Sequence, residues 1–484
     1  MDNPPPFKQS ASSRKASAVI NLYPDQADLV GRIRAKLPHH KSILMQAATG
    51  AGKTIMAAYM MHAARLKGTS TNFVVPRREL LKQTAETLQS YDIPFGYCAA
   101  GHHSNPFELT TLSTVGTLAR RLDTSPKSKL VFIDESHYGA TALGQIIQHY
   151  LALGSWVIGL SATPWKMSGK GLGDWFEVME QGPPIADLIE RGRLSQYRLF
   201  APSRPDLSGI KTTAGDYAKG QLADYMEQDK VLVGNAVKHY IDHANGRLNV
   251  AYCTSIKHAE IVAEMFRDRG VAAAAIHGKM DDDERAVLIK AFARRELKVL
   301  TNCDLLTFGF DLSSAAQMDV TIESMSDLRP TKSLSLQMQK WGRVLRKKDF
   351  PALIFDHGGN VDRHGLPDAD REWSLEGQEK QSREGAEKTE PARQCKSCYF
   401  VHRPAPVCPN CGNVYPIQSR MVEEVEGELS EVTGPRGPTP RQEQGRAQSL
   451  DDLIQLGQIR GYKNPRAWAS KVMGARMAKQ RRTA

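Results

Sequence analysis

A run of small residues that ends in a lysine and a threonine is the segment best equipped for chemistry: it reads Gln46-Ala47-Ala48-Thr49-Gly50-Ala51-Gly52-Lys53-Thr54. The two glycines let the backbone curl so that its N–H groups point at phosphate oxygens. The ammonium of Lys53 suits the β- and γ-phosphates of ATP, and the hydroxyl of Thr54 suits a magnesium ion. The sequence therefore predicts a phosphate-binding P-loop, although Ala47 stands where the general pattern has glycine. A glycine-containing strand–helix turn without a ligand is the alternative.

Two adjacent acids form the second candidate site. Asp134 and Glu135 directly follow residues 130–133, a short apolar run typical of a buried strand. The carboxyl ends of strands in an open parallel sheet are where such sheets bind ligands. We therefore expect Asp134 to hold magnesium through water and Glu135 to polarise an attacking water molecule. A helix N-cap is the alternative for two acids after a strand, but it does not explain why the P-loop and the acids occur in order on two strand ends.

The elements that must position these residues alternate between strand and helix. Short apolar runs separated by helical patterns predict strands near Ser42, Phe73, Thr110, Leu130 and Trp156, and again near Asn249, Ala273, Lys298, Val320 and Ala352. This alternation is typical of an α/β fold in which helices cover both faces of a parallel sheet. The two series predict two such domains, and the Pro-, Gly- and Ser-rich stretch at 202–220 predicts a hinge between them.

The order of motifs from about residue 20 to 355 resembles the DExH-box branch of the superfamily 2 helicases. The resemblance implies two tandem RecA-like domains. It also implies that Gln26 reads the adenine edge beside Tyr23, and that Ser161-Ala162-Thr163-Pro164 couples hydrolysis to domain movement. For the nucleic-acid backbone it implies contacts from two strand-end segments of the first domain and one of the second, with these residues: Pro76, Arg77, Arg78, Ser113, Thr114, Thr254 and Ser255.

The segment Gln339-Lys340-Trp341-Gly342-Arg343-Val344-Leu345-Arg346 matches the family's Gln-x-x-Gly-Arg-x-x-Arg signature. The resemblance implies that Arg343 and Arg346 approach the γ-phosphate from the second domain. A guanidinium suits that role because the transition state spreads charge over the phosphoryl oxygens. A solvated helix face is the alternative, and Gln337 offers a competing register. The resemblance also assigns ATP contacts to Gln339, Gly309 and Asp311, whereas the pair Lys340-Trp341 is unusual for the family.

Composition suits a soluble protein with a polyanionic partner. The chain has 484 residues and a formal net charge of +11, too long for one core and basic enough for nucleic acid. No run approaches the 18 apolar residues of a membrane span, and the N-terminal stretch has no apolar signal region. We expect a reducing cytoplasmic compartment. The predicted organisation is a disordered tail at 1–17, the ATP-binding domain at 18–200, a hinge at 201–224, the second domain at 225–357, a linker at 364–391, a zinc ribbon at 392–416, a linker at 417–448 and a basic tail at 449–484.

The zinc ribbon is predicted from two Cys-x-x-Cys pairs separated by nine residues: Cys395, Cys398, Cys408 and Cys411. Each pair can present two thiolates to one tetrahedral ion. Two disulfides or four structural thiols are the alternatives, and both fit a reducing compartment and such regular spacing poorly. A ribbon this short has too small a core to fold alone, so metal binding would supply its folding energy.

The last segment is strongly basic. From Arg460 onward there are eight Lys or Arg residues and no acids, with Tyr462 and Trp468 among them. These aromatic rings could stack on bases while the cations meet phosphates, or they could pack on the protein itself. With the ribbon, this tail resembles the C-terminal ends of phage and prophage helicases.

Together these features predict an ATP-dependent nucleic-acid translocase or helicase that uses Mg2+ and carries Zn2+. The resemblance to phage-type enzymes favours DNA over RNA, and replication, recombination or repair as the setting. An RNA helicase is the first alternative. A non-catalytic nucleic-acid adaptor is the second, and the presence of Lys53, Asp134, Glu135 and Arg343 together argues against it.

Overall fold

The computed structural model describes residues 20–105, 107–138, 140–166, 168–202, 205–306, 310–377, 392–415, 443–444 and 446–480. The chain forms two compact units, Met1–Ile417 and Gln418–Ala484. The tail predicted at 1–17 lies outside the described residues, as does most of the linker predicted at 417–448. None of the described helices is long and apolar enough to cross a membrane.

The first domain is built on a seven-stranded, fully parallel sheet in the order β3-β4-β2-β5-β6-β1-β7. Its central strands are buried on both faces, which is why they appear in the sequence as continuous apolar runs. The register aligns Gln46 with Ser161, so the loops after β1 and β6 leave the same edge of the sheet. The strands are β1 (Ser42–Gln46), β2 (Thr71–Val75), β3 (Gly96–Cys98), β4 (Thr110–Thr114), β5 (Leu130–Ile133), β6 (Trp156–Ser161) and β7 (Val178–Gln181).

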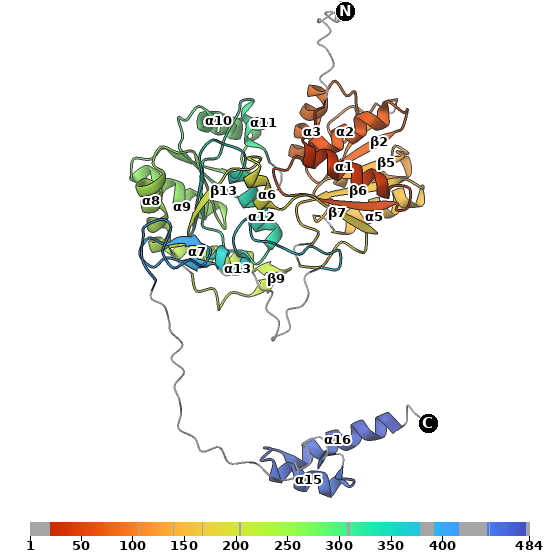
Figure 1. Cartoon of the computed structure of the whole chain (residues 1–484), viewed down its shortest axis with the longest axis vertical. Helices are drawn as coiled ribbons and strands as arrows, with labels where there is room; N and C mark the ends of the chain where they lie inside the picture. Colours follow the sequence, from red (N-terminus) through yellow and green to blue (C-terminus); the bar gives the residue numbers. More distant parts are fainter. Residues whose placement is uncertain are drawn as a thin grey trace, which may run out of the picture. The chain divides into compact units, whose positions relative to one another are not determined.

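Helices cover both faces of this sheet (Figure 1). Alternate residues along β1 show the two layers: Ile43 and Met45 belong to the apolar core that includes α2, and Leu44 to the core that includes α5. In α3 the buried residues recur at helical spacing, which leaves its other side to solvent. The helices are α1 (Pro24–Lys36), α2 (Lys53–Arg65), α3 (Arg78–Ser90), α4 (Val115–Leu118) and α5 (Ala140–Ala152), with a 3-10 turn at Leu122–Thr124.

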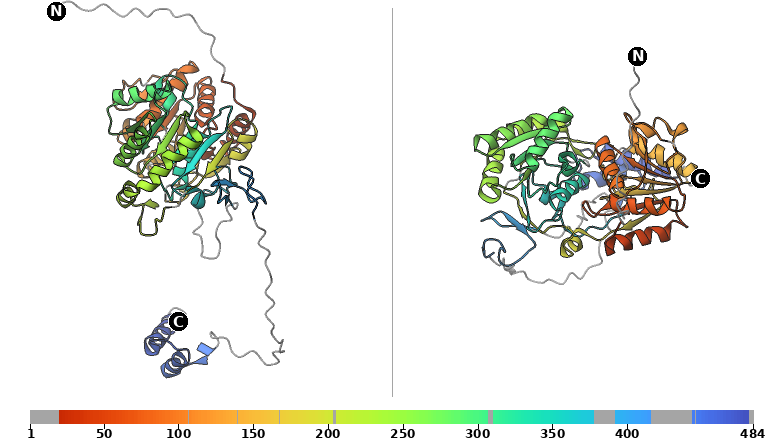
Figure 2. Two further views of the ribbon diagram at one scale, coloured as in Figure 1. Left: turned by 90° about the vertical axis from the view of Figure 1, so that its left-hand side faces the viewer. Right: turned by 90° about the horizontal axis from the view of Figure 1, so that it is seen from above.

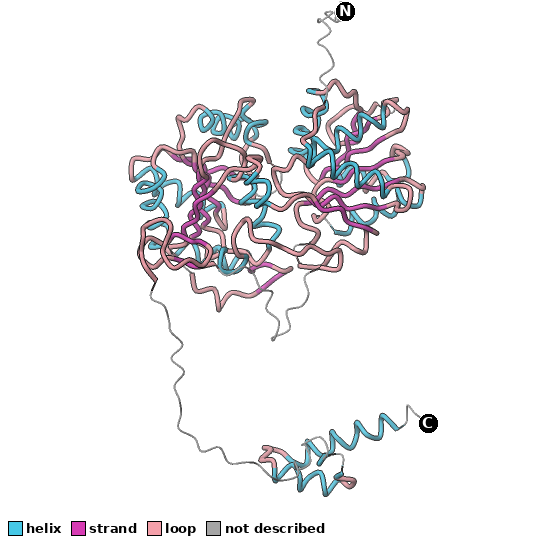
Figure 3. Tube along the Cα trace, viewed as in Figure 1, coloured by secondary structure: helices cyan, strands magenta, loops and turns pink. Residues whose placement is uncertain are grey.

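The second domain has an eight-stranded sheet in the order β12-β13-β11-β14-β15-β8-β17-β16. Its first six strands are parallel, and β17 and β16 join the β8 edge in antiparallel fashion. Figure 3 shows the strands of both domains between helices, and Figure 2 gives two further views. The strands are β8 (Tyr197–Phe200), β11 (Asn249–Tyr252), β12 (Ala273–His277), β13 (Val299–Cys303), β14 (Ser324–Asp327), β15 (Ala352–Asp356), β16 (Arg393–Gln394) and β17 (Phe400–His402).

The remaining elements of this unit connect and cover the second sheet. They include a short hairpin of β9 and β10, and α9 is capped by Ser255, whose hydroxyl accepts from the N–H of His258. The elements are α6 (Ile185–Glu190), β9 (Thr212–Thr213), β10 (Asp216–Tyr217), α7 (Lys219–Gln228), α8 (Lys230–Ala244), α9 (Ile256–Asp268), α10 (Asp282–Ala293), α11 (Leu312–Ala316), α12 (Leu334–Val344) and α13 (Asn360–His364).

Three expectations about the domain organisation are wrong. Strand β8, assigned to the first domain by the boundary at 200, pairs with β15 in the second sheet, so the chain crosses between the domains within residues 182–196. The stretch 201–224 is therefore no hinge, and Leu207, Tyr217 and Leu222 within it belong to a core of the second domain. Residues 364–377, predicted as part of a flexible linker, are packed against both domains, with Leu366 only 2% exposed. The rest of that linker lies outside the described residues.

The second unit is a pair of helices, α15 (Leu450–Ile459) and α16 (Pro465–Gln480). Ser449 caps α15 by accepting from the N–H of Asp452, and the side chain of Asp452 accepts from the N–H of Ser449 in return. Buried Leu453 and Ala469 show that the two helices pack together. The segment predicted as a basic tail is thus a helical hairpin over its described residues.

Candidate functional site

The P-loop connects β1 to the first turn of α2. Gly50 and Gly52 both have φ of 88°, a conformation in which glycine avoids steric strain. The ammonium of Lys53 donates to the carbonyl oxygens of Ala47 at 3.0 Å and Ala48 at 3.4 Å. These neutral acceptors satisfy the lysine only partly, so an anionic phosphate would be the stronger partner.

Gln26 supports the P-loop from α1. Its side-chain N–H donates to the carbonyl of Ala51 at 2.7 Å, and its side-chain oxygen accepts from the N–H of Tyr23 at 3.0 Å. The residue is only 3% exposed, and a Cβ added at Gly52 would lie 2.4 Å from its nitrogen. In this structure Gln26 therefore holds the P-loop backbone. Its reading of an adenine edge stays a prediction.

Tyr23 lies beside this segment with its ring half exposed. The guanidinium of Arg193 sits 3.4 Å from the ring centroid and donates to Asp25 at 2.7 Å. Arg193 belongs to the segment that crosses between the domains. Arg193 thus joins the interdomain segment to the region predicted to bind the adenine base of ATP.

The two acids lie at the carboxyl end of β5. Asp134 is 6% exposed, and burial together with the neighbouring Glu135 raises its pKa to about 7, although Lys53 opposes the shift. A carboxyl in this position favours ionisation when a cation is close. The carboxylate of Asp134 and the hydroxyl of Thr54 are oxygen donors of the kind that magnesium prefers. The chemistry of this donor set fits the predicted ion.

Helix α12 of the second domain touches the first domain directly above these groups. The side-chain N–H of Gln339 lies 3.3 Å from Glu135 Oε2 and 3.3 Å from His137 Nε2. One turn earlier, the hydroxyl of Ser335 lies 2.6 Å from that of Thr163. These contacts join the Asp134–His137 and Ser161–Pro164 motifs to one helix.

The glycine of the arginine signature faces the P-loop. A Cβ added at Gly342 would lie 2.2 Å from the Cβ of Thr49, so only glycine permits this approach. Arg343 follows on the same helix and is 8% exposed, and its Nε has no hydrogen-bond partner among the described residues. Burial and the nearby Arg346 lower the pKa of Arg343. A buried guanidinium with an unused donor is suited to an anionic ligand.

Arg346 and Asp311 pair with each other. The guanidinium of Arg346 lies 2.6 Å from Asp311 Oδ2. Desolvation opposes ionisation of Asp311, but Arg346, the N–H of Ser314 and Arg343 together outweigh it and lower the pKa of this carboxyl. Asp311 also caps α11 by accepting from the N–H groups of Ser313 and Ser314. The predicted ATP contacts of both residues stay predictions, and Gly309 lies outside the described residues.

Lys340, whose presence in the signature is unusual, has a defined structural role. It is fully buried and donates to both carboxylate oxygens of Asp327, at 2.6 and 2.8 Å. The same carboxylate accepts from Gln337 and Asn360. This network fixes the inner side of α12 to the end of β14.

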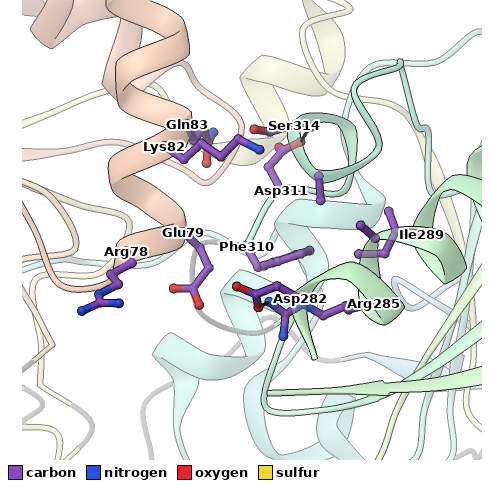
Figure 4. A pocket seen from close by; sticks show the side chains of 12 residues that line it. Arg78, Glu79, Lys82, Gln83, Asp282, Arg285, Ile289, Phe310, Asp311 and Ser314 are labelled. Atoms are coloured by element: carbon purple, nitrogen blue, oxygen red, sulfur yellow. Dashed lines mark hydrogen bonds and ion pairs between the residues drawn. The ribbon is translucent and has the colours of Figure 1, made fainter. Parts of the chain in front are cut away.

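A pocket between the two domains lies beside the predicted nucleic-acid segments. Figure 4 shows side chains from α3 on one side of it and from α10 and the start of α11 on the other, with Phe310 between them. The guanidinium of Arg285 lies 5.7 Å from the ring centroid of Phe310. Cations and acids share the lining, which includes Arg78, Glu79, Lys82, Asp282, Arg285 and Asp311.

The predicted backbone contacts fall into two groups. Pro76, Arg77 and Arg78 lie at the start of α3, and Arg77 donates to the hydroxyl of Tyr138 at 3.2 Å. Ser113 does not fit its predicted role, because it is fully buried in the sheet and donates to Asn72 at 2.7 Å. The other predicted hydroxyls are engaged locally: Thr114 with Thr117, Thr254 with His258, and Ser255 with Glu227.

Comparisons with known proteins agree with this arrangement. Residues 19–166 match the family described as the res subunit of Type III restriction enzymes, and residues 233–348 match the conserved helicase C-terminal domain. A 51.5 kDa protein of Lactococcus phage (isolate 7-9) is 30% identical over 389 residues, covering 80% of this chain and 81% of the phage protein. The chain belongs to the superfamily 2 helicases.

Two further similarities concern parts of longer proteins. This helicase is 28% identical over 357 residues, 67% of its length, to a Schizosaccharomyces pombe protein provisionally named mitochondrial ATP-dependent helicase irc3, of which it covers 55%. A Type ISP restriction-modification enzyme, LlaBIII, bound to DNA shares the fold, with a TM-score of 0.51 and 14% identity over 69% of this chain. The helicase spans about a quarter of that enzyme's chain, 27%.

The four ribbon cysteines of the helicase come together as one cluster. Their sulfur atoms all lie within 4.8 Å of one another, with Cys395–Cys411 at 3.7 Å and Cys398–Cys408 at 3.8 Å. A tetrahedron of thiolates around zinc has edges of about 3.8 Å, so the cluster fits this ion. Desolvation opposes ionisation of Cys395, but the N–H groups of Cys398 and Ser397, together with Tyr415 and Cys411, outweigh it and lower its pKa to about 6.

The ribbon is also less independent than its sequence indicates. Strand β17 pairs with β8, placing Phe400 opposite Phe200 and Val401 opposite Leu199. The rings of Phe200 and Phe400 lie 5.5 Å apart. The second sheet therefore contributes a folding surface that the ribbon lacks on its own.

Three features of the helicase site escaped the motif comparison: Arg193, the support from Lys340, and the packing of residues 364–377. Their sequence signals are weak, because each depends on a contact between segments far apart in the chain. Of the three, only Lys340 could be singled out from the sequence, because a lysine is unusual at that position of the arginine signature.

Proposed function

We propose that this helicase is an ATP-hydrolysing motor that translocates along DNA or separates its strands, in replication, recombination or repair. The observation that carries the proposal is the unpartnered, buried Nε of Arg343 on the helix that contacts the P-loop. A buried cationic donor without a partner is costly unless a ligand uses it. The γ-phosphate of ATP held by Lys53 is a ligand of the right charge.

In the proposed mechanism Lys53 exchanges its carbonyl partners for phosphate oxygens when ATP binds. Magnesium, when bound near Asp134 and Thr54, neutralises phosphate charge. Glu135 orients the water that attacks in line, and Gln339 holds Glu135 in contact with the second domain. Arg343 stabilises the charge that develops on the phosphoryl oxygens. Release of phosphate removes the partner of Arg343 and favours opening of the cleft.

The proposed track for nucleic acid crosses both domains at the pocket between α3 and α10. Arg78 and Lys82 supply cations from the first domain, and on the second domain Arg285 lies in the lining, paired with Asp282. Glu79 and Asp282 in the same lining would repel a phosphate that strays from these cations. Opening and closing of the cleft would change the spacing between the two sets of cations, which is what stepping along a strand requires.

DNA is the preferred substrate in this proposal. The family matched by the first domain is described as the res subunit of a restriction enzyme, and a relative that matches 80% of this chain comes from a phage. An RNA helicase remains the competing proposal within the family. The zinc ribbon and the α15–α16 hairpin are proposed as additional grips on the substrate, since the hairpin exposes Lys463, Arg466 and Lys471.

Steady-state ATP turnover, measured with single-stranded DNA, duplex DNA, a fork and RNA, tests the function. Lys53→Ala should abolish turnover and leave the fold intact, and Lys67→Ala, an exposed lysine of the same domain, should behave like the wild type. If RNA stimulates ATP turnover and none of the DNA substrates does, the substrate is RNA and not DNA. Binding of nucleic acid with no ATP turnover by the wild type would favour a non-catalytic adaptor.

A further inference from the structure

Residues 365–377, here named the clasp, run from α13 of the second domain onto the first domain. Neither matched family region includes them, because the second of these regions ends at residue 348. Their charged composition resembles a linker, yet Leu366 and Ala369 are buried with the apolar core. The clasp is therefore an addition to the motor that is folded onto it.

The first half of the clasp is fixed to the second domain. Arg371 donates to four backbone carbonyls, those of His364, Leu366, Pro367 and Ala369, at 2.7 to 3.2 Å. Asp368 accepts from the hydroxyl of Tyr197 in β8 and pairs with Arg403 of the ribbon. This half of the clasp thus moves with the second sheet.

The second half of the clasp is bound to the first domain, chiefly through its backbone. The indole N–H of Trp165 donates to the carbonyl of Ser374 at 2.9 Å, and the N–H of Gly173 donates to that of Leu375 at 2.8 Å. The rings of Trp165 and Trp373 meet edge to face with centroids 4.8 Å apart. A Cβ added at Gly171 would lie 1.9 Å from the carbonyl oxygen of Leu375, so the clasp requires glycine there.

Trp165 is the residue at which these contacts converge with the motor. It directly follows the Ser161–Pro164 motif and is only 5% exposed. Its carbonyl accepts from the hydroxyl of Ser335 in the first turn of α12 at 3.2 Å, and Ser335 also meets Thr163. The second domain therefore reaches this one loop from two sides, through α12 and through the clasp.

We propose that the clasp holds the Ser161–Trp165 loop against α12, with Trp373 as a positioning residue for the ATPase cycle. The proposal rests on the proposed ATPase function and extends it to the control of cleft closure. The loop that carries Thr163 is held by α12 on one side and by the clasp on the other. Without the Trp373 ring the clasp holds it less firmly, so the Thr163–Ser335 contact and the closed cleft are populated less. Loss of an edge-to-face aromatic pair should change the equilibrium between the open and the closed cleft by about two- to tenfold.

Hydrogen exchange of the full chain without nucleotide tests the positioning directly. Trp373→Ala and Gly171→Ala should both speed amide exchange in residues 161–166 and in the first turn of α12. Gly171→Ala should displace the clasp from the Ser161–Trp165 loop without changing either tryptophan. Glu372→Ala, exposed within the clasp, and Gly209→Ala, whose added Cβ meets nothing within 4 Å, are the matched controls. Unchanged exchange in both variants overturns the proposal.

Kinetics supply the second readout. Both variants should lower kcat for ATP about two- to tenfold, keep ADP binding within about twofold because the clasp does not touch the P-loop, and show no further loss when combined. Trp373→Phe should recover most of kcat. Equal losses in ADP binding and kcat, or wild-type turnover by Gly171→Ala, overturn the proposal. A wild type without ATPase activity would refute the proposed function, and the exchange experiment would still decide the role of the clasp.

If one of the two variants fails to fold, the other carries the exchange measurement alone; if both fail, Trp373→Leu, which removes the ring and keeps an apolar side chain, carries it. Unfolding of Trp373→Ala together with wild-type exchange in Gly171→Ala would place Trp373 in the core and overturn its positioning role.

Discussion

The close approach of Gly342 to the P-loop gives the sharpest test of the closed cleft. In Gly342→Ala, the new Cβ would lie 2.2 Å from Thr49 Cβ and 2.5 Å from its Cγ2, whereas ordinary contacts are 3.4–4 Å. The helix and the P-loop must then separate by about 1 Å, and Arg343, the next residue, moves with the helix. Misplacement of a catalytic group by about 1 Å costs about 100-fold in rate, so kcat should fall by roughly that factor.

The same substitution should not weaken the second domain itself. Alanine favours a helix interior by about 1 kcal/mol over glycine, and α12 is otherwise unchanged. ADP binding, which relies on the P-loop, should therefore stay close to that of the wild type. The predicted pattern is a large loss of kcat with little change in nucleotide binding or in Tm. Gly116→Ala, whose added Cβ meets nothing within 4 Å, is the matched control.

A second substitution decides whether the clash is the cause. Thr49→Gly removes the three side-chain atoms that the new methyl group would meet. The double variant Thr49→Gly/Gly342→Ala should therefore turn over ATP at least about tenfold faster than Gly342→Ala alone. Single-turnover ATP hydrolysis, compared with the Thr49→Gly single variant, measures this recovery. Wild-type turnover by Gly342→Ala, or a double variant no better than the single one, would refute the reasoning that the cleft must close to this distance.

Further predictions concern the arginine, the C-terminal unit, the metal and the response to pH. Arg343→Ala should lower ATP turnover far more than nucleotide affinity, measured by single-turnover kinetics and ADP titration; equal losses would make Arg343 a ground-state ligand only. A chain ending at residue 417 should keep basal ATPase activity and bind DNA more weakly, and each lost phosphate contact should reduce the salt slope of log affinity by about 0.7 to 0.9; an unchanged slope would exclude the hairpin as a grip. Metal analysis should find one zinc per chain, lost when the cluster cysteines are replaced by serine; a metal-free chain would contradict the ribbon assignment. Burial lowers the pKa values of His258 and His364 to about 4 and that of His357 to about 3. Below about pH 6.5 these histidines bind protons in the unfolded chain but stay neutral in the folded protein, so each should lower the free energy of unfolding by about 2 kcal/mol at pH 5. In denaturant unfolding, the stability of His357→Gln should depend less on pH than that of the wild type. An unchanged pH dependence would refute the buried histidine as its origin.

Much of the motor could be predicted from the sequence because its strands are buried on both faces. Runs such as residues 43–45 and 130–133 have no polar side for solvent, and the polar loops that follow them stand out. The strands predicted near Ser42, Phe73, Thr110, Leu130 and Trp156 are present as β1, β2, β4, β5 and β6. Short edge strands such as β3 and β7 were missed, since three or four half-buried residues carry little pattern.

Which sheet a strand joins was less accessible to prediction. Strand β8 follows the first domain in the chain, and nothing in Tyr197–Phe200 indicates that it pairs with β15 about 150 residues later. The clasp was missed for a related reason. Its contacts with Trp165 and Gly173 use backbone carbonyls, which every residue has, so the sequence there shows only its charged, linker-like side chains.

The spacing along α12 explains how one helix serves both domains. Ser335, Gln339 and Gly342 recur at intervals of four and three residues and form one stripe, the outer stripe, which contacts the first domain. Arg343 lies one turn after Gln339, next to Gly342. Leu336, Lys340 and Val344 form a second, inner stripe beside the first and are at most 2% exposed. A lysine on the inner stripe is tolerated because Asp327 neutralises it, and that ion pair opposes rotation of the helix about its axis. The outer stripe can then present a glycine where the P-loop approaches and a buried arginine beside it, because the inner stripe fixes which side of the helix faces the cleft.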